Sequence, residues 1–475
     1  MNSNRSRIPA TVAIGVASFC AVLVGQRSTV PPQPVVDRLA PVGVAKPSRG
    51  TLVEKPAALV PTVPAGMTVS VFAELQAPRL MVYAPNGDLF VSSPLANNIT
   101  VLRDANNDGV FETRGVYAQG DVVGRGRGAG AGSGAGAARG GAPARPAPPP
   151  APAPAAAVNP GINGPILGAA APACVAPPAS ASRGPGALAA PFGMAFHDGY
   201  LYVGNTGSIV RYKYADGDLK AQDAPEKLLD LPAGGHSTRN IVFNRAGTKM
   251  YVAVGSQSNN NAGEDCRRAA VLEFNPDGTG YRVYASGIRN PVGLTLQPGS
   301  DTLWVAVNER DNLGDDLVPD YATSLKDGGF YGWPYSYIGQ HPDPRYVGAF
   351  PDLVKRAIVP DVLIPAHSAA LGIAFYTGTQ FPQRYRNGGF VALHGSWNRS
   401  TAAGYKVAFF PMTDGKPGPL EDFMTGFLLN DGAGGTAIER WGRPVGVTVS
   451  RDGGLLVSDD GSNRIWKISA ATGAR

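Results

Sequence analysis

A short motif recurs six times along the chain, and this repeat limits the possible fold more than any other feature of the sequence. Each copy is a turn rich in Gly, Asp or Asn that leads into an apolar strand with an aromatic or large aliphatic residue at a similar position. The copies occupy residues 86–91, 198–203, 247–252, 300–305, 387–392 and 452–457. Apart from one biased stretch, their spacing is on the order of 50 residues, the length of a four-stranded propeller blade. We therefore predict an all-β fold, a six-bladed β-propeller over residues 66–472.

A pair of β-sandwiches is the competing fold. Its turn signals would recur every ~8–12 residues, and it offers no reason for one motif to return at blade length. No long stretch of the sequence has the period of a helix. The repeat therefore favours the propeller.

Two further segments differ in composition from the repeats. Residues 28–65 are rich in Pro and Val without periodicity, and we expect a tether there. Residues 120–190 are an Ala, Gly and Pro tract that cannot bury enough apolar surface to offset its ordering entropy. We predict a disordered insertion in the first blades.

The N-terminus resembles an export signal. Arg5 and Arg7 precede an apolar stretch at residues 8–25, the order of a positive region and a hydrophobic region. We interpret residues 1–27 as a signal peptide or an N-terminal membrane anchor. The expected location is the periplasm or the exterior of the cell, with membrane tethering as the open alternative.

The net charge of +6 does not indicate a nucleic-acid partner. Residues 122–196 carry five arginines and no acidic residue, and the rest of the chain is nearly neutral. Elsewhere Lys and Arg alternate with Asp and Glu, so no basic stripe forms. We expect no duplex-binding surface.

The cysteines exclude two kinds of metal site. Cys20, Cys174 and Cys266 are the three cysteines, and none lies in a CxxC or CxxCH spacing. This excludes a c-type haem and a zinc finger. A disulfide between Cys174 and Cys266 and two free thiols both remain open.

Propellers bind ligands over the central channel, so polar loops at strand ends are the candidate sites. His236 follows two glycines at the entrance of a strand and suits a general base, although a structural histidine is the alternative. Gln257 lies in a polar loop that suits either ligand binding or a turn. Arg289 and Asn290 precede another strand, where a guanidinium can bind a planar carboxylate or form a salt bridge between blades.

Two acidic segments are candidate cation sites. Residues 308–316 are rich in oxygen donors at a strand end, which suits calcium but also an ordinary surface turn. Residues 104–109 match the opening of an EF-hand loop, but no Glu follows at the twelfth position. We interpret the second segment as a solvated turn or a weak structural site.

Later loops add aromatic and cationic residues to the predicted rim. Residues 394–399 and 440–446 combine Trp with Arg, which suits clamping of a flat anionic ligand or ordinary packing of blades.

With the blocks at 287–294, 308–316 and 329–334, these motifs resemble the soluble quinoprotein sugar dehydrogenases that use pyrroloquinoline quinone (PQQ), most closely the sorbosone dehydrogenase branch. The resemblance covers residues 66–468 apart from the insertion. It implies a six-bladed propeller that oxidises the anomeric or aldehyde carbon of a sugar to a lactone or acid. It also implies hydride transfer to the quinone and an external electron acceptor, a cytochrome or a quinone.

The resemblance assigns roles to the candidate residues. His236 is implied as the base that takes the hydroxyl proton, and Arg289 as the group that polarises the quinone oxygen. Gln257, Asn290 and Arg443 match cofactor-contacting positions.

The main-chain carbonyls of Asp311 and Asn312 match the ligands of a bridging calcium ion. The family's glucose-oxidising members have a lysine in the loop at residues 394–399, so we expect Arg399 or Lys406 to replace it. His367 and Trp397 are expected at the substrate rim.

Two other functions fit a propeller. A calcium-dependent lactonase would need carboxylates and asparagines at the channel, and Arg289 with Arg443 argues against it. A non-catalytic propeller that binds protein or glycan would need neither base nor metal, and His236 argues against that.

Overall fold

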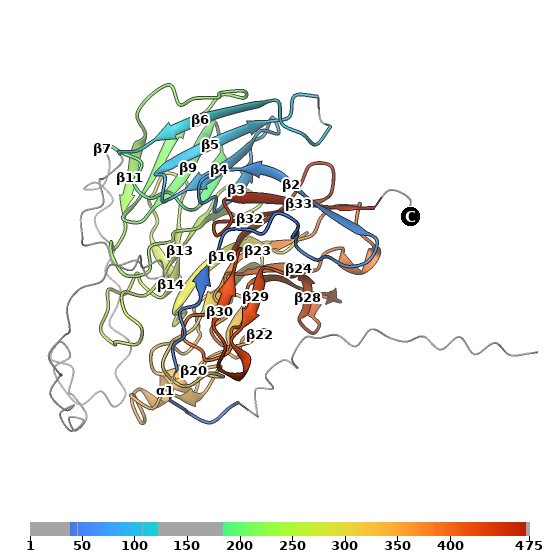
Figure 1. Cartoon of the computed structure of the whole chain (residues 1–475). Coiled ribbons are helices and arrows are strands. Elements are labelled where there is room, and N and C mark those ends of the chain that lie inside the picture. The colour runs from blue at the N-terminus through green and yellow to red at the C-terminus, as the bar shows by residue number, and fades with distance from the viewer. Residues whose placement is uncertain (1–38, 45, 107, 122–183, 472–475) are drawn as a thin grey trace, which may run out of the picture.

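The computed structural model describes residues 39–44, 46–106, 108–121 and 184–471, and this part of the chain is nearly all β (Figure 1). Its one α-helix is the four-residue α1 (Pro351–Val354). In the described residues, no helix has both the length and the apolar character needed to span a bilayer. The predicted signal peptide and most of the predicted insertion lie outside the described residues.

Most described strands form six largely antiparallel sheets that follow one another along the chain. Sheet 1 contains β3 (Met81–Tyr83), β4 (Leu89–Ser93), β5 (Asn98–Arg103) and β6 (Thr113–Gln119). Sheet 2 contains β8 (Met194–His197), β9 (Tyr200–Asn205), β10 (Ser208–Lys213), β11 (Glu226–Asp230) and β7 (Gly184–Pro185). Sheet 3 contains β12 (Ile241–Phe243), β13 (Met250–Val254), β14 (Ala270–Phe274), β15 (Arg282–Ser286) and β19 (Gly329–Phe330).

The C-terminal half of the chain supplies most strands of the other three sheets. Sheet 4 contains β16 (Asn290–Leu296), β17 (Leu303–Asn308), β18 (Asp320–Ser324) and β22 (Val362–Ile364). Sheet 5 contains β23 (Ala370–Phe375), β24 (Gly389–Leu393), β25 (Lys406–Phe410) and β28 (Glu421–Met424). Sheet 6 contains β31 (Pro444–Val449), β32 (Leu455–Asp459), β33 (Arg464–Ala470) and β2 (Met67–Glu74).

Small additional sheets decorate these six. One contains β1 (Thr51–Leu52), β30 (Ile438–Arg440) and β29 (Leu428–Asp431). Two hairpins pair β20 (Ser336–Tyr337) with β21 (His341–Pro342), and β26 (Met412–Thr413) with β27 (Lys416–Pro417).

The first strands of the six sheets form a closed ring. β3 contacts β8, β8 contacts β12, and the contacts continue through β16, β23 and β31 back to β3. Strand β2 joins the outer edge of sheet 6 antiparallel to β33, so both ends of the described chain build one sheet. This is the propeller-like all-β architecture that the repeat predicts.

Each copy of the sequence motif marks the turn before a second strand and the start of that strand. These second strands are the most buried part of each sheet, and β4, β13, β24 and β32 are buried along their whole length. Large side chains then fill the space between neighbouring sheets. Trp304 of sheet 4, for example, stacks on Phe410 of sheet 5 at 5.5 Å between ring centroids.

Hydrogen bonds between sheets fix where one sheet meets the next. In three sheets a polar side chain near the end of the second strand donates to a main-chain carbonyl at the entrance of the next first strand. Ser92 Oγ donates to Phe192 O at 2.7 Å, Asn308 Nδ2 to Ala370 O, and Ser458 Oγ to Arg79 O. The last of these joins sheet 6 to sheet 1 and therefore closes the ring.

The predicted tether differs from the structure. Residues 43–62, apart from 45, form what we call the N-terminal strap, which lies along the sheets. Gly43 N donates to Leu313 O at 2.9 Å, and Ser48 N donates to Trp397 O at 3.0 Å. Strand β1 then pairs in parallel with β30. The strap is attached because its main-chain groups make hydrogen bonds to other parts of the chain. A composition rich in Pro and Val does not reveal such partners.

We expect Ser458→Ala to lower the free energy of unfolding by about 1–3 kcal/mol. Ser458 is fully buried, donates to Arg79 O and accepts from Gly446 N at 2.8 Å, so alanine leaves two buried main-chain groups unpaired. Denaturant unfolding measures the change. The control is Ser70→Ala on the exposed face of β2, and an equal effect of both changes would show that ring closure does not depend on Ser458.

Candidate active site

The candidate residues gather at one end of the ring of first strands. His236 lies in the loop that leads into β12, Arg289 directly precedes β16, and Arg443 directly precedes β31. Asp311 follows β17, which runs antiparallel to β16, so its last residue lies beside the start of β16. The closed ring therefore brings together residues that are far apart in the sequence.

The environment of His236 selects one of its two nitrogens as the base. Nδ1 lies 2.8 Å from Ser256 O, and because a carbonyl only accepts, Nδ1 carries the proton. Nε2 is then the nitrogen with a free lone pair. Burial, and then the positive charge of Arg289, lower the pKa of His236 to about 3, so the ring is neutral at neutral pH.

Asn290 lies against His236 and contributes an unpaired acceptor. A Cβ atom on Gly255 would lie 2.4 Å from Asn290 Oδ1 and 2.6 Å from His236 Cβ, so only glycine lets these side chains approach. Asn290 Oδ1 is buried and has no hydrogen-bond partner among the described residues. An orphaned acceptor of this kind suits a ligand donor.

Arg289 is buried among neutral acceptors. Its Nε donates to Asn259 O at 3.0 Å, its NH1 to Glu309 O at 2.7 Å, and its NH2 to Asn259 Oδ1 at 2.9 Å. The carboxylate of Asp311 lies 3.6 Å from NH2, beyond a normal hydrogen bond. Arg289 therefore gives its hydrogen bonds to neutral groups beside His236, with the carboxylate of Asp311 as a longer ion-pair partner.

Asn259 links Arg289 to the loop after β17. Its Oδ1 also accepts from Asp311 N at 2.9 Å, and its Nδ2 donates to Asp311 O at 3.1 Å. Trp333 Nε1 donates to Asn259 O at 3.1 Å. The motif at residues 329–334 thus supports the site indirectly, by holding Asn259.

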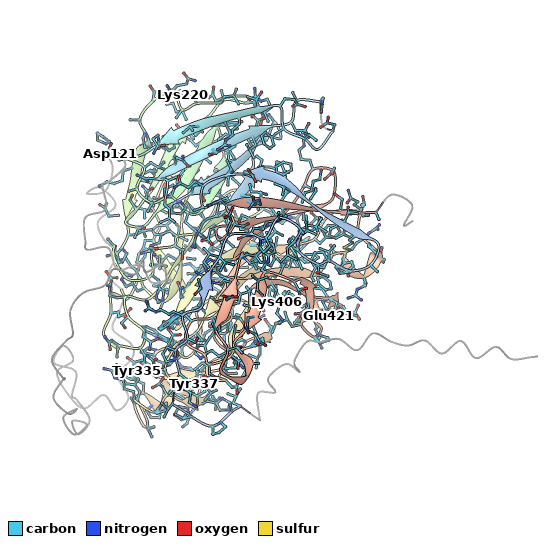
Figure 2. All side chains as sticks on the ribbon, in the orientation of Figure 1. Asp121, Lys220, Tyr335, Tyr337, Lys406 and Glu421 are labelled. Carbon is cyan, nitrogen blue, oxygen red and sulfur yellow. The ribbon has the colours of Figure 1, made fainter. Side chains whose placement is uncertain are left out.

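The excursion between β18 and β22 supports the same loops from outside. Asp343 is buried, pairs with Arg310 NH1 at 2.6 Å and accepts from Asn260 Nδ2 at 3.0 Å. Tyr346 OH donates to Asn260 O at 2.9 Å. The same excursion carries Tyr335 and Tyr337, which Figure 2 labels at one end of the molecule.

The two carbonyls implied as calcium ligands differ in their surroundings. Asp311 O accepts hydrogen bonds from Asn259 Nδ2 and from Arg310 Nε at 3.0 Å, so both of its lone pairs are engaged. Asn312 has a left-handed φ of 72°, and no described residue donates to its carbonyl. In this arrangement the Asn312 carbonyl fits a cation, and the Asp311 carbonyl does not.

His367 lies inside the wall of the site, not at its rim. Its Nδ1 lies 3.3 Å from Asp311 Oδ1 and its Nε2 lies 2.9 Å from Gly314 O, so both nitrogens face acceptors. Burial alone would lower the pKa of His367, but these two hydrogen bonds outweigh it and raise the pKa. The residue is 7% exposed, which leaves little surface for a substrate.

Trp397 lies at the surface beside the strap. The ring is half-buried, and the guanidinium of Arg49 lies over it, 5.6 Å from its centroid. Together with the Ser48 hydrogen bond, this contact attaches the strap to the rim. His367 and Trp397 are the two residues predicted at the substrate rim. Of these two, only Trp397 lies at the surface.

Arg399 and Lys406 are both engaged in ion pairs. Arg399 NH2 pairs with Asp316 Oδ1 at 2.9 Å, and its NH1 donates to Asp315 O at 2.6 Å. Lys406 on β25 pairs with Asp422 on β28, next to Glu421, which Figure 2 labels with it. Each charge is neutralised by a carboxylate.

Gln257 is exposed beside the loop that carries His236. Its main-chain N donates to Glu264 Oε2 at 2.6 Å, and its side chain lies close to Gly234, where a Cβ would come within 3.3 Å of Nε2. The amide is therefore placed at the same opening as His236.

Arg443 belongs to a second buried cluster that the sequence reasoning did not identify. Its Nε donates to His394 O at 3.2 Å. His394 Nε2 lies 2.8 Å from Asp460 Oδ1, and Arg79 NH2 pairs with Asp460 Oδ2 at 2.6 Å. Aligned repeats would have revealed Arg79, since four of the six first strands have an arginine one or two residues before them: Arg79, Arg239, Arg289 and Arg443.

Arg239 shows that such an arginine also has a structural use. It is fully buried and donates to the carbonyls of Pro232, His236 and Thr238, each at 2.7 Å. It thereby shapes the loop that presents His236.

The supporting role of Asn259 was not predicted from the sequence, because its partners Arg289 and Asp311 belong to loops of another sheet.

The acidic turn at residues 104–109 lies between β5 and β6, away from the first strands. Asp104, Asp108 and Glu112 bring one carboxylate oxygen each to within 4.8 Å of one another, and the last two are exposed. Cys266 is disulfide-bonded, and the other two cysteines lie outside the described residues.

Comparison with known families gives two matches. A family model described as glucose/sorbosone dehydrogenase matches residues 201–396, and a TrAA12-like model matches residues 354–471. An uncharacterised protein from Borreliella burgdorferi is 30% identical over 299 residues, which cover 59% of this chain and 76% of that protein.

Two curated dehydrogenases match over part of their length. The pyrroloquinoline quinone-dependent pyranose dehydrogenase of Coprinopsis cinerea is 28% identical over 50% of this chain and 40% of its own. The aldose sugar dehydrogenase YliI of Escherichia coli is 26% identical over 38% of this chain and 52% of its own. The alignments thus span about half or less of these two relatives.

Solved structures share the fold. The holo form of the C. cinerea pyranose dehydrogenase PQQ domain has a TM-score of 0.62 at 19% identity, covering 87% of this chain and 97% of that one. A calcium structure of a Trichoderma reesei family AA12 enzyme has a TM-score of 0.62 at 16% identity, covering 88% and 100%. These likenesses concern the fold, and the sequence matches show that the chain belongs to the glucose/sorbosone dehydrogenase family of oxidoreductases.

Proposed function

We propose that this protein oxidises the anomeric or aldehyde carbon of a sugar, of the aldose or L-sorbosone type, to a lactone or acid, with PQQ as the hydride acceptor. The observation that carries the proposal is the geometry of His236, whose Nδ1 is held by Ser256 O while Nε2 remains a free base beside Arg289. A neutral imidazole next to a buried guanidinium suits removal of a hydroxyl proton where negative charge develops.

The described residues fit an anionic cofactor. Arg289 and Arg443 stand at the entrances of two first strands, and Asn290 supplies a buried acceptor without a partner. The hydrogen bonds of Arg289 go to neutral acceptors, so none of them is made to a carboxylate. PQQ carries several carboxylates and, when bound, would accept the hydride.

The residues of this chain would divide the work. His236 Nε2 would take the proton from the sugar hydroxyl, with Nδ1 fixed in its protonated state by Ser256. Arg289 would stabilise the negative charge that develops at the cofactor. Asn259 holds the guanidinium of Arg289 in place. Gln257, at the same opening, would contact the cofactor at the surface.

We keep calcium in the proposal as a second cofactor but derive no step from it. The Asn312 carbonyl is open to a cation, whereas Asp311 O accepts from two donors. A calcium structure exists for the structurally similar T. reesei family AA12 enzyme, and calcium there is a property of that protein. A cation at Asn312 would need Arg310 to turn away before Asp311 O also became a ligand.

We further propose that the six sheets are the blades of a six-bladed propeller, that the protein acts in the periplasm or outside the cell, and that its electrons pass to an external cytochrome or quinone. The ring of first strands supports the first point. The order of charge and hydropathy in residues 1–25 supports the second.

The proposal is tested by adding PQQ and calcium to purified protein and measuring dye reduction with aldoses and sorbosone. We expect a change in PQQ absorbance on binding, followed by turnover. Omitting PQQ is the control. Absence of cofactor uptake would rule out the proposed dehydrogenase, and hydrolysis of lactones without PQQ would favour a lactonase.

His236→Ala and Arg443→Ala separate proton removal from cofactor binding. We expect the first change to lower kcat by about 10²–10⁴-fold with an unchanged dissociation constant for PQQ. The second should weaken PQQ binding, because a cationic partner of a carboxylate is lost. Equal PQQ affinity in both variants, with turnover kept in the first, would refute these roles.

The pH dependence follows from the lowered pKa of His236. Because the folded protein holds the imidazole neutral far below the ordinary histidine range, Nε2 can accept a proton from about pH 5 to 8 without a change of state. We expect the His236 ring resonances in an NMR titration to stay constant over this range, with His236→Ala identifying them. A midpoint near the ordinary value of about 6.5 would contradict the structure.

Removal of calcium should lower turnover, because the proposal includes a cation at the Asn312 carbonyl. We expect dialysis against EDTA to lower dye reduction and added calcium to restore it, whereas magnesium, which prefers a more rigid octahedral site, should restore less. Full activity after chelation, with no metal detected in the protein, would remove calcium from the proposal.

A further inference from the structure

The half of the ring built by sheets 5, 6 and 1 carries a cationic group that the proposed chemistry does not use. Arg79 lies in the link from β2 to β3, two residues before its first strand, and Arg289 and Arg443 each lie one residue before theirs. Its side chain is 15% exposed, so most of the side chain is removed from bulk water. A mostly buried arginine needs partners for its donors.

Only one nitrogen of Arg79 has a partner among the described residues. NH2 donates to Asp460 Oδ2 at 2.6 Å, and Asp460 is the one described carboxylate in contact with Arg79. Its Nε and NH1 make no hydrogen bond to a described residue, and neither is among the fully buried unpaired atoms, so both remain open to solvent. The guanidinium therefore has two nitrogens available to an anion.

Asp460 is shared between Arg79 and His394, which fixes its orientation. Its Oδ1 accepts from His394 Nε2 at 2.8 Å and its Oδ2 from Arg79, so both oxygens face donors. His394 is 2% exposed, and its main-chain O accepts from Arg443 Nε. These contacts connect Arg79 to Arg443 through Asp460 and His394.

The charge of this cluster favours an anion. Burial lowers the pKa of His394 to about 3, with the charge of Arg443 as the next cause, so the imidazole adds no charge. The carboxylate of Asp459 accepts hydrogen bonds from main-chain N–H groups and from the side chains of Ser462 and Trp466. No ion pair joins it to Arg79 among the described residues. Two guanidinium groups thus flank the single carboxylate of Asp460.

The contrast with Arg399 supports the same conclusion. Arg399, which the resemblance offers as a cofactor ligand, has its charge neutralised by Asp316. Arg79 has a shared carboxylate and two open nitrogens. Both arginines pair with a carboxylate, but the unpaired Nε of Arg399 is fully buried, whereas the unpaired nitrogens of Arg79 are not.

We propose that Arg79, positioned by Asp460 and His394, binds a carboxylate group of a ligand in the channel beside Arg443. The proposal rests on the function proposed above. A carboxylate could come from PQQ itself or from an acidic sugar substrate such as a uronic acid, and both would be recognised by the same paired N–H donors.

The test compares Arg79→Gln, Arg79→Lys and the wild-type protein. Arg211→Gln is the matched control, because Arg211 also pairs with a carboxylate, Glu226, but lies in the third strand of sheet 2. Two titrations of the apo-protein are needed, one with PQQ followed by absorbance and one with glucuronate followed by the shift in Tm. Steady-state KM values for glucuronate and glucose complete the set.

We expect Arg79→Gln to weaken binding of one carboxylate ligand by about 10-fold or more, with Arg79→Lys intermediate and Arg211→Gln unchanged. Weaker PQQ binding would assign the site to the cofactor. Unchanged PQQ binding with weaker glucuronate binding, and an unchanged KM for glucose, would assign it to the substrate.

Other outcomes overturn one proposal or the other. If the wild-type protein takes up no PQQ, the proposed function fails, and the glucuronate titration alone still decides the role of Arg79. If Arg79→Gln keeps the wild-type Tm and binds both ligands as the wild-type protein does, the carboxylate site is wrong. A variant with a lowered Tm is judged by Arg79→Lys, which preserves the ion pair with Asp460.

Discussion

Closure of the ring of first strands is the constraint on which the rest of the structure depends. Each entrance to a first strand is fixed by its neighbours, and the bond from Ser458 to the carbonyl of Arg79 joins the last sheet to the first. The loops that carry the candidate residues end at these entrances. The distances between those residues are therefore set by the strands and not by the loops. This explains how glycine-rich loops such as the one before β12 can hold His236 in one orientation.

The arginines show how the same residue type serves different purposes. Arg289 and Arg239 are surrounded by neutral carbonyls, whereas Arg399 meets a carboxylate. A carbonyl satisfies the donors without cancelling the charge, and the carboxylate nearest Arg289, that of Asp311, lies 3.6 Å away and makes no hydrogen bond to it. A carboxylate accepts hydrogen bonds from the donors and also cancels the charge. Arg399 therefore serves as a bridge between loops. The partner, not the residue, therefore decides whether a buried arginine is available to a ligand.

The sequence predicted the second strands, and it placed His236, Arg289 and Arg443 at strand entrances, because strand periodicity and strand-end motifs are local properties. It did not predict the positions of His367 or Arg399, whose partners Asp311 and Asp316 are brought close only by the packing of sheets 4 and 5. Asn259 was invisible for the same reason. The strap was interpreted as a tether because composition does not show that its backbone pairs with the edge of β30.

The strap has a consequence for the order in which the molecule is completed during synthesis. It is made before any of the six sheets, yet its partners, β30 and the loop around Trp397, are among the later parts of the chain to leave the ribosome. Strand β2 likewise waits for β33. Arg443 and Asp460 lie in the same late region, so a growing chain holds its strap and first sheets without a complete channel. The loops at this end of the ring are therefore complete only after β33 has been made and has paired with β2.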